Sequence, residues 1–368
     1  MAGFPFMRQA ETFLSSLPFI LLLAVFILPC PMSAAAKPRP AIAFVHLLLP
    51  PGGEPHASPA GWIGSLDRAR DTLESLRIPT IVSSASPGNA EDLNELSEMD
   101  PEVLITTSPL LYAAASDVAK RSPNTVFFAC TDETVHDNMS GFQARTYEAH
   151  YLAGLIAGAL SEDGVIGYLA NDPYQSKASR LRNANAFTLG AQKSKAAIRV
   201  LYAPGNDPDE ELKTLIAAGA DIVDLERALP SLVERLREHS VRYVGTAGRT
   251  VDPLCLAAPE WEWSNAFGDL LTQVRFGIWR PRNVSYGIKE GVVGLSPFGP
   301  AVPETVRVRV REAKEAIRNG ASPFEGPVRD VSGSLRIAEG SVPDDATLRG
   351  MDWRVQGLEP LPLTPDGL

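Results

Sequence analysis

Histidine, cysteine and acidic side chains most often bind metals or transfer protons in proteins, and in this sequence they do not cluster. The five histidines are His46, His56, His136, His150 and His239. No two of them have the spacing of zinc ligands on one helix face, such as His-x-x-x-His. Glu148 and His150 are two residues apart and would point to different sides of a helix. We therefore expect no metal site.

The sequence also contains no short motif for nucleophilic catalysis or phosphate binding. It has no Gly-x-Ser-x-Gly turn, no Walker A loop and no Gly-x-Gly-x-x-Gly loop after a predicted strand. Cys130 ends a predicted strand and could face a cleft as a nucleophile, but no histidine is obviously placed to activate it. A small buried residue is the simpler interpretation. We expect the protein not to be an enzyme and to bind no cofactor.

Short apolar runs alternate with amphipathic segments after about residue 40. The apolar runs predict buried strands at Ala41–His46, Thr80–Ser83, Val103–Thr107, Val126–Cys130, Val165–Leu169, Ile198–Tyr202, Ile222–Leu225 and Val241–Gly245. The amphipathic segments predict helices at Ile63–Leu76, Ala90–Leu96, Leu110–Arg121, Glu148–Leu160, Ala178–Lys193, Pro208–Ala218 and Pro230–His239. Continuous apolar strands separated by helices indicate an α/β fold with doubly wound parallel sheets.

Two further regions have recognisable patterns. The helix at Glu148–Leu160 is apolar on most faces and contains small residues that include Gly154 and Gly158, so we expect it to pack tightly on a sheet. In the C-terminal part, Val302–Asn319 predicts a charged helix and Pro327–Ala338 a hairpin that turns at residues 332–334. Asp344–Met351 is consistent with a short helix.

The first 36 residues have the pattern of a secretory signal peptide. Leu14–Leu28 is almost wholly apolar, Arg8 precedes it, and Ser33–Ala36 supplies small residues for cleavage. An apolar run of about 15 residues, interrupted by Pro18, is short for a membrane span of about 20 residues. Lipid attachment at Cys30 is the alternative, but the preceding residue is a proline rather than a small one. We expect cleavage near residue 36 and a soluble periplasmic protein.

Size and charge limit the remaining possibilities. About 330 residues remain after cleavage, which is more than one hydrophobic core usually supports, so two lobes are expected. The net charge of −10 argues against nucleic acid as a partner. Only Cys130 and Cys255 remain, and the sequence leaves open whether they form a disulfide.

Three stretches, in order, resemble motifs of the basic membrane protein (BMP) family. Ala144–Gly154 resembles R-x-x-E-x-x-Y-L-A-G, Gly164–Tyr168 with Asn185–Gly190 resembles G-x-I-G-Y…N-A-F-x-x-G, and Gly287–Phe298 resembles G-x-K-[DE]-G-V-V-x-L-x-P. With the tail at Pro323–Trp353, the resemblance covers nearly all of residues 41–355. Members of this family are solute-binding proteins of ABC importers, and many are purine nucleoside receptors.

The resemblance implies a type I periplasmic binding protein, with two doubly wound parallel-sheet lobes joined by crossing strands and a ligand between them. We expect residues 41–143 with about 251–283 in the first lobe. Residues 144–250 with about 284–320 should form the second lobe, and residues 321–368 a C-terminal hairpin and tail.

In the first lobe the resemblance implies a stacking role for Trp62, because relatives place an aromatic on the ligand base there. Ser108 ends a strand and Tyr112 lies one helical turn on, so both could reach a ligand, although Ser108 could equally cap the next helix. Asp132 matches an acid that accepts ring N–H groups in nucleoside-binding relatives. Trp263 could form a cleft wall or pack in the core.

In the second lobe Asn185 and Phe187 belong to a family motif, and either contact the ligand or hold their helix on its sheet. Lys289 matches a family lysine near ligand hydroxyls, or is a solvated charge. Asn206 stands where relatives often place an aromatic. Arg227 and Arg249 stand where relatives place acids, which would favour an anionic or carbonyl-rich ligand over an ordinary nucleoside.

The resemblance therefore implies a solute receptor that binds a small planar, purine-like or nucleoside-like molecule. Its partners would be the permease and ATPase subunits of an ABC importer, supplied by other chains. A sensory binding protein that signals through a membrane receptor and a binder of an anionic small molecule are the alternatives. A repressor of the same fold would need a DNA-binding segment where the signal peptide lies.

Overall fold

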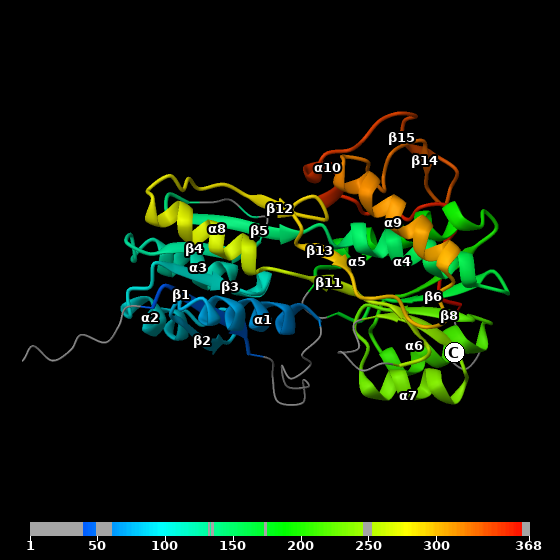
Figure 1. The fold of residues 1–368 in the computed structure, drawn as a ribbon, viewed down its shortest axis with the longest axis horizontal. Coiled ribbons are helices and arrows are strands. Elements are labelled where there is room, and N and C mark those ends of the chain that lie inside the picture. Colours follow the sequence, from blue (N-terminus) through cyan, green and yellow to red (C-terminus); the bar gives the residue numbers. More distant parts are fainter. Residues whose placement is uncertain are drawn as a thin grey trace, which may run out of the picture. The chain divides into compact units, whose positions relative to one another are not determined.

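The computed structural model of the chain (Figure 1) describes residues 40–48, 61–131, 133, 136–172, 175–245 and 252–362, all within the unit Arg39–Leu368. The predicted signal peptide, Cys30, Asp132 and Arg249 lie outside the described residues. Each of the eight predicted strands is present close to its expected bounds. The predicted α/β fold with two parallel sheets is confirmed.

The first sheet has six strands in the order β12-β5-β4-β3-β1-β2, and all neighbouring pairs are parallel. Its strands are β1 (Ile42–Leu47), β2 (Thr80–Ala85), β3 (Val103–Thr106), β4 (Val126–Cys130), β5 (Met139–Ala144) and β12 (Val284–Tyr286). Because alternate strand residues face opposite sides, Phe44 packs in one core cluster and Val45 in another.

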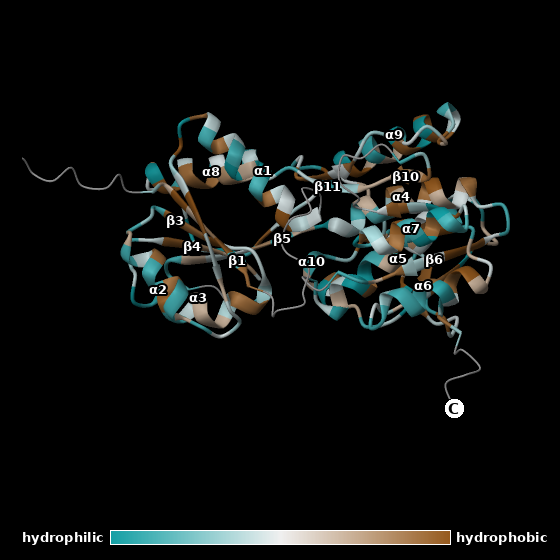
Figure 2. Cartoon of the chain, turned by 90° about the horizontal axis from the view of Figure 1, so that it is seen from below, coloured by the Kyte–Doolittle hydropathy of each residue, from teal (hydrophilic) through white to brown (hydrophobic). Residues whose placement is uncertain are grey.

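Helices cover both faces of this sheet (Figure 2). The layer that contains Phe44 is closed by α1 (Gly61–Ser75) and α8 (Ser264–Arg275), and the opposite layer by α2 (Glu91–Glu98) and α3 (Tyr112–Ala119). A short 3₁₀ turn, η1 (Pro109–Leu111), precedes α3. This double cover explains why the strands are apolar throughout rather than on alternate residues.

The second sheet repeats this plan in the order β10-β9-β8-β6-β7-β16, again with parallel neighbours. Its strands are β6 (Val165–Leu169), β7 (Arg199–Ala203), β8 (Ile222–Leu225), β9 (Arg242–Gly245), β10 (Cys255–Ala257) and β16 (Leu358–Pro360). The helices are α4 (Thr146–Leu160) and α5 (Lys177–Ser194) on one face, and α6 (Pro208–Ala217) and α7 (Pro230–Glu238) on the other.

The lobe boundaries expected from the sequence place β10 in the first lobe and β12 in the second. In the structure each of these two strands joins the opposite sheet. β10 extends the second sheet beside β9, and β12 extends the first sheet beside β5. The position of β12 depends on Gly141 of β5, whose N–H donates to the Asn283 side chain at 3.1 Å. A Cβ atom on Gly141 would lie 2.2 Å from that Asn283 oxygen. The crossings are completed by β11 (Pro259–Trp261), which pairs antiparallel with β13 (Val293–Leu295).

The apolar helix α4 packs closely on a helix, α5, and not only on the sheet as expected. A Cβ atom on Gly154 would lie 2.0 Å from the Phe187 carbonyl oxygen, and one on Gly190 would lie 2.1 Å from the Tyr151 carbonyl oxygen. Such distances are far inside van der Waals contact, so the two backbones approach as closely as they do only because both helices have glycine there. These glycines belong to two of the motifs that carry the family resemblance.

The C-terminal region confirms its predicted elements and adds a strand to the second sheet. Helix α9 (Glu304–Arg318) is followed by the hairpin β14 (Val328–Arg329) and β15 (Leu335–Ile337), and by α10 (Asp345–Arg349). Asp330 holds the hairpin turn by accepting from the Ser332 hydroxyl and from Arg336, which lowers its carboxyl pKa to about 2. The expected tail then returns as β16 beside β7.

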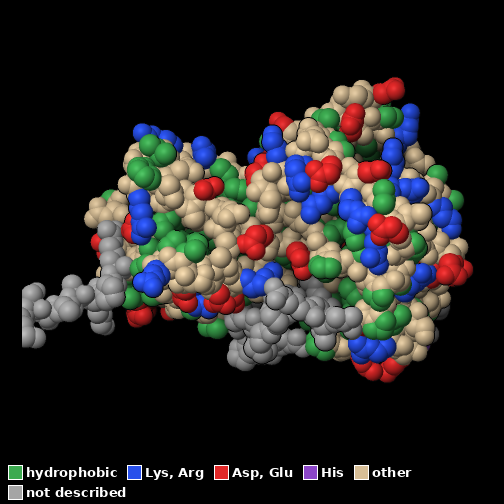
Figure 3. Space-filling view, viewed as in Figure 1, with side chains coloured by type: hydrophobic (Ala, Val, Ile, Leu, Met, Phe, Trp, Pro, Cys, Tyr) green, Lys and Arg blue, Asp and Glu red, His purple; other side chains and the backbone are tan. Residues whose placement is uncertain are grey.

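Charged side chains of both signs are interspersed over the face drawn in Figure 3. That face therefore shows no region in which acidic side chains alone gather. The two cysteines left open by the sequence, Cys130 and Cys255, are not joined by a disulfide.

Candidate functional site

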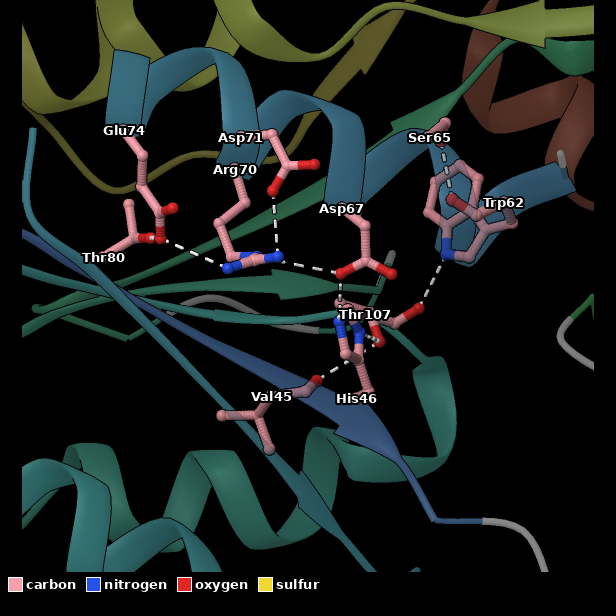
Figure 4. A network of polar contacts seen from close by, with 10 residues as sticks. All are labelled: Val45, His46, Trp62, Ser65, Asp67, Arg70, Asp71, Glu74, Thr80 and Thr107. Carbon is pink, nitrogen blue, oxygen red and sulfur yellow. Dashed lines mark hydrogen bonds and ion pairs between the residues drawn. The ribbon is translucent and has the colours of Figure 1, made fainter. Parts of the chain in front are cut away.

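Trp62 lies in the first turn of α1, and a hydrogen bond fixes its ring (Figure 4). Its Nε1–H donates to the Thr107 main-chain oxygen at 2.7 Å. Thr107 directly follows β3, so the tryptophan is attached to the carboxyl edge of the first sheet. In parallel α/β sheets this is the edge at which ligands bind. The indole is half-buried, which leaves part of it open to contact.

The aromatic neighbours of Trp62 support it from behind and from the side. Its ring is stacked with Phe142 at 6.4 Å between centroids and meets the edges of Trp261 and Trp263 at 5.9 and 5.3 Å. Trp263 is fully buried, so of its two expected roles the structure supports packing in the core. Such offset and edge-on contacts favour a rigid aromatic wall.

The other expected first-lobe residues differ in their positions. Ser108 is fully buried, and its hydroxyl accepts the Leu110 N–H at 3.3 Å, so its contacts are those of a cap on η1. Tyr112 begins α3 and is half-buried against the second core layer. Both residues remain on the same sheet edge as Trp62, because they follow β3.

A buried polar cluster lies at the carboxyl edge of the second sheet. Glu226 directly follows β8 and accepts a hydrogen bond from the Tyr168 hydroxyl at 2.8 Å and one from Asn183 of α5 at 3.4 Å. Two residues earlier, on the same face of the sheet, Asp224 lies 3.1 Å from the His150 ring of α4. Four elements therefore bring two carboxylates and an imidazole together.

Burial and charge act in opposite directions on this cluster. Burial raises the pKa of Glu226 to about 7, although the nearby His150 opposes the change. Burial alone would lower the pKa of His150, but Asp224, with Glu226 and Asp172 behind it, outweighs burial and raises it. The cluster can therefore accept hydrogen bonds or exchange protons near neutral pH.

The presence of Glu226 changes the expectation drawn from the arginines. The end of β8 carries a buried carboxylate, Glu226, immediately before the half-buried Arg227. Arg227 is held through its backbone, since its N–H and its C=O both bond to the Asn171 side chain at 2.9 and 2.8 Å. The described residues at this edge of the second sheet therefore combine an acid with a base and are not purely basic. Arg249 lies outside the described residues.

Two of the remaining second-lobe candidates, Asn185 and Phe187, are packed in the core. Asn185 is fully buried and binds the tail, because its side chain donates to the Trp353 oxygen at 2.8 Å and accepts the Val355 N–H at 2.9 Å. Phe187 is fully buried against Tyr168 at 5.5 Å between centroids. Of the two roles expected for them, these contacts support packing. Asn206 precedes α6, and Lys289 is exposed. Among the described residues, neither side chain forms a hydrogen bond with the cluster around Glu226.

The R-x-x-E and G-x-K-E-G motifs meet each other instead of surrounding the polar cluster. Arg145 donates to Glu148 at 3.0 Å and to Glu290 at 2.5 Å. The Glu148 carboxylate accepts the Ile288 N–H at 2.6 Å, and a Cβ atom on Gly287 would lie 2.5 Å from the same carboxylate. Burial opposes the charge on Arg145, but these carboxylates raise its pKa. The two motifs thus join two of the segments that pass between the sheets.

Sequence reasoning missed Glu226 of the polar cluster and Thr107, which holds Trp62. It also missed His46, whose ring contacts the Thr107 hydroxyl. Each lies at or just after the carboxyl end of a predicted strand. That position was the available signal, because ligand-binding side chains in parallel sheets follow strand ends. Among the described residues, no group of three or more His, Cys, Asp or Glu side chains forms a candidate metal site.

Comparison with known proteins agrees with the predicted family. Residues 66–217 match the model of the Bmp family, described as ABC transporter substrate-binding protein PnrA-like. A purine-binding protein of Brucella abortus is 28% identical over 344 residues, covering 89% of this chain and 95% of that protein. A putative ABC transporter glucose-binding protein of Haloferax volcanii is 28% identical over 311 residues, covering 77% and 78%.

Solved structures show the same fold at low sequence identity. A solute-binding protein of an ABC transporter system from Conexibacter woesei has a TM-score of 0.60 and 17% identity, over 76% of this chain and 97% of that one. One from Aeropyrum pernix has a TM-score of 0.60 and 16% identity, over 84% and 95%. A transcriptional activator of the comK gene from Bacillus halodurans has a TM-score of 0.62 and 15% identity, over 76% and 99%.

The fold alone therefore does not distinguish a transporter component from a regulator, and the distinction comes from the family match and the curated relatives. The resemblance predicted from the three motifs is confirmed, and the chain is similar to the Bmp family and to solute-binding proteins of ABC transporters.

Proposed function

We propose that this protein binds a small planar solute of the purine type, with the Trp62 indole as the wall on which the ring stacks. The observation that carries this proposal is the combination of Trp62's position and its fixation. It stands at the carboxyl edge of the first sheet, half-buried, hydrogen-bonded to Thr107 and stacked with Phe142. An indole held in this way offers a flat apolar face at little entropic cost.

The second lobe would contribute the polar contacts. Glu226, at the end of β8, can accept the N–H groups that a purine presents at its ring edge, and Asn171 fixes the adjoining backbone at Arg227. Glu226 already accepts from Tyr168 and Asn183, and a purine N–H would add a further donor to this buried carboxyl group. Asp132 and Lys289, which the resemblance assigns to ligand contacts, stay predictions.

The two curated relatives suggest different solutes. The relative from Brucella abortus is named as a purine-binding protein, and the one from Haloferax volcanii as a glucose-binding protein. A tryptophan face suits both a purine ring and the apolar face of a sugar. The carboxylate at Glu226 suits N–H donors as well as hydroxyls. The stacking geometry favours the purine, since a planar ring covers more of the indole.

Isothermal titration calorimetry would test this proposal with adenine, guanine, hypoxanthine, adenosine, inosine, glucose and an anionic nucleotide as ligands. We expect a purine or its nucleoside to bind and Trp62→Ala to weaken binding by about 100-fold, the effect of losing about 2–3 kcal/mol of aromatic contact. Trp279→Phe is the matched control, because Trp279 is half-buried in the same lobe but lies before β12, at the opposite sheet edge. Binding of glucose alone, or equal loss in both variants, would contradict the proposal.

The proposal includes export and an importer as partner. Permease and ATPase subunits would be separate chains that receive the loaded protein. In the part of the chain that the structure describes, no helix is both long and apolar enough to cross a membrane. Cell fractionation with the N-terminal 36 residues present or deleted would test export, which is expected only when they are present.

A further inference from the structure

Besides its aromatic neighbours, the Trp62 ring is held by a hydrogen bond to one residue of the sheet edge. Thr107 is fully buried and accepts the Trp62 Nε1–H through its main-chain oxygen at 2.7 Å. Its own N–H donates to the Val45 oxygen at 3.0 Å, and its hydroxyl lies 3.2 Å from the same oxygen. The indole can therefore keep its position only if Thr107 keeps its own.

A buried histidine holds the side chain of Thr107. His46, in β1, has its Nδ1 atom 3.2 Å from the Thr107 hydroxyl and its Nε2 atom 3.2 Å from an oxygen of Asp67 in α1. It is 5% exposed, so its ring is fixed between the sheet and the helix. Figure 4 shows these groups in a row from Asp67 through His46 and Thr107 to Trp62.

The hydrogen bonds among Asp67, His46 and Thr107 depend on where the protons lie. The Val45 oxygen and the Asp67 carboxylate only accept hydrogen bonds, so the contacts with them need the Thr107 hydroxyl proton and a proton on His46 Nε2. The His46–Thr107 contact then needs a second ring proton, on Nδ1. With a neutral imidazole, the Thr107 hydroxyl instead donates its hydrogen bond to Nδ1 and turns away from the Val45 oxygen. The His46–Thr107 contact persists in both states.

The charged surroundings of this ring come from the helix above it. Asp67 of α1 contacts His46 directly, and Arg70 of the same helix has its Nε atom 3.9 Å from the same Asp67 oxygen. On the neighbouring strands His46 pairs with Ser84 of β2, and Thr107 follows β3 on the other side. The carboxylate thus anchors Nε2, while Nδ1 remains the atom that reaches Thr107.

We propose that His46 is a positioning residue for the ligand wall, whose Nδ1 atom fixes the plane of the Trp62 indole through Thr107. This inference rests on the proposed function for its biological meaning, but the coupling itself exists without ligand. Asn reproduces the Nδ1 position of histidine and Gln the Nε2 position, so the two substitutions separate the contact with Thr107 from the contact with Asp67.

The experiment is ¹⁹F NMR of the protein labelled with 5-fluorotryptophan, with the Trp62 resonance assigned from Trp62→Phe. We expect His46→Asn to leave this resonance close to its wild-type position, and His46→Gln and His46→Leu to shift or broaden it. The Trp353 resonance, from the C-terminal tail, reports whether the fold is retained. An unchanged Trp62 resonance in His46→Gln, or equal changes in His46→Asn and His46→Gln, overturns the proposal.

A second arm measures adenine binding to the same variants. His46→Gln and His46→Leu should weaken binding by about tenfold, the effect of one lost hydrogen bond, and His46→Asn by much less. If adenine does not bind the wild-type protein, the proposed ligand is wrong, while the resonances still decide whether His46 positions Trp62. If adenine binds all variants equally, the positioning role is wrong and the proposed ligand stands.

Discussion

Replacing Glu226 with Gln should stabilise the protein at pH 8 and leave it almost unchanged at pH 5. The carboxyl group is 6% exposed, and burial raises its pKa from 4.5 to about 7. A group whose pKa is higher in the folded than in the unfolded state contributes stability that is complete below the unfolded value and is lost as the pH rises through the folded value. For Glu226 this window runs from about pH 4.5 to about pH 7.

The magnitude follows from the same two values. One pH unit corresponds to about 1.4 kcal/mol, so ionising Glu226 in the folded state costs about 3 kcal/mol above pH 7. Gln keeps the acceptor for Tyr168 and has no charge to bury. The variant should therefore match the wild type within about 1 kcal/mol at pH 5 and exceed its free energy of unfolding by about 2–3 kcal/mol at pH 8.

Urea denaturation followed by circular dichroism at pH 5, 6, 7 and 8 measures the difference. Glu98→Gln is the matched control, because it makes the same change of a carboxyl to an amide at an exposed position at the end of α2. His150 is retained in the variant, and its raised pKa gives a remaining pH dependence of the same sign. If Glu226→Gln is less stable than the wild type at pH 8, then a positive charge rather than burial controls this carboxyl, and the reasoning is refuted.

Three further substitutions, with Gly268→Ala as a control, test the packing that supports the two sites. Gly190→Ala should destabilise by about 3 kcal/mol or more in urea denaturation, because its Cβ would lie 2.1 Å from the Tyr151 oxygen. Gly268→Ala, in a helix with open space around it, should instead stabilise by about 0.5–1 kcal/mol, and a similar loss in both variants would contradict the close approach of α4 and α5. Asn185→Ala leaves the Trp353 oxygen and the Val355 N–H without their partner, so limited proteolysis should cut the tail faster at unchanged urea stability of the first lobe; wild-type cleavage rates would contradict this. Glu148→Gln should cost about 1–3 kcal/mol, since the amide keeps only one of the two oxygens that accept from Arg145 and the Ile288 N–H, and calorimetry showing no fall in the melting temperature would contradict it.

Periodicity predicted the long strands and helices well because parallel strands covered on both sides are apolar throughout. It missed β5, whose sequence of Met139–Ala144 includes Gly141 and Gln143. This strand exists because β4 and β12 pair with it on both sides, which no local pattern records. The short crossing strands β11 and β13 have the same origin, since three residues are too few for a periodic signal.

The candidate site was predictable at one position of its first-lobe wall and only in outline elsewhere. Trp62 followed from the resemblance, and the structure fixes it at the sheet edge through Thr107. Glu226 was not predicted because it stands beside Arg227 in the sequence, and a sequence does not show which of two adjacent charged residues is buried. The motif residues Arg145 and Glu148 bind each other and the Ile288 N–H, so a motif that identifies the family here marks a structural junction.

Mass spectrometry of the small molecules released from gently purified protein tests the central claim most directly. The account predicts that a purine or purine nucleoside accompanies the wild-type protein and Trp279→Phe, and is lost from Trp62→Ala. A non-planar solute retained equally by the wild type and Trp62→Ala would contradict it.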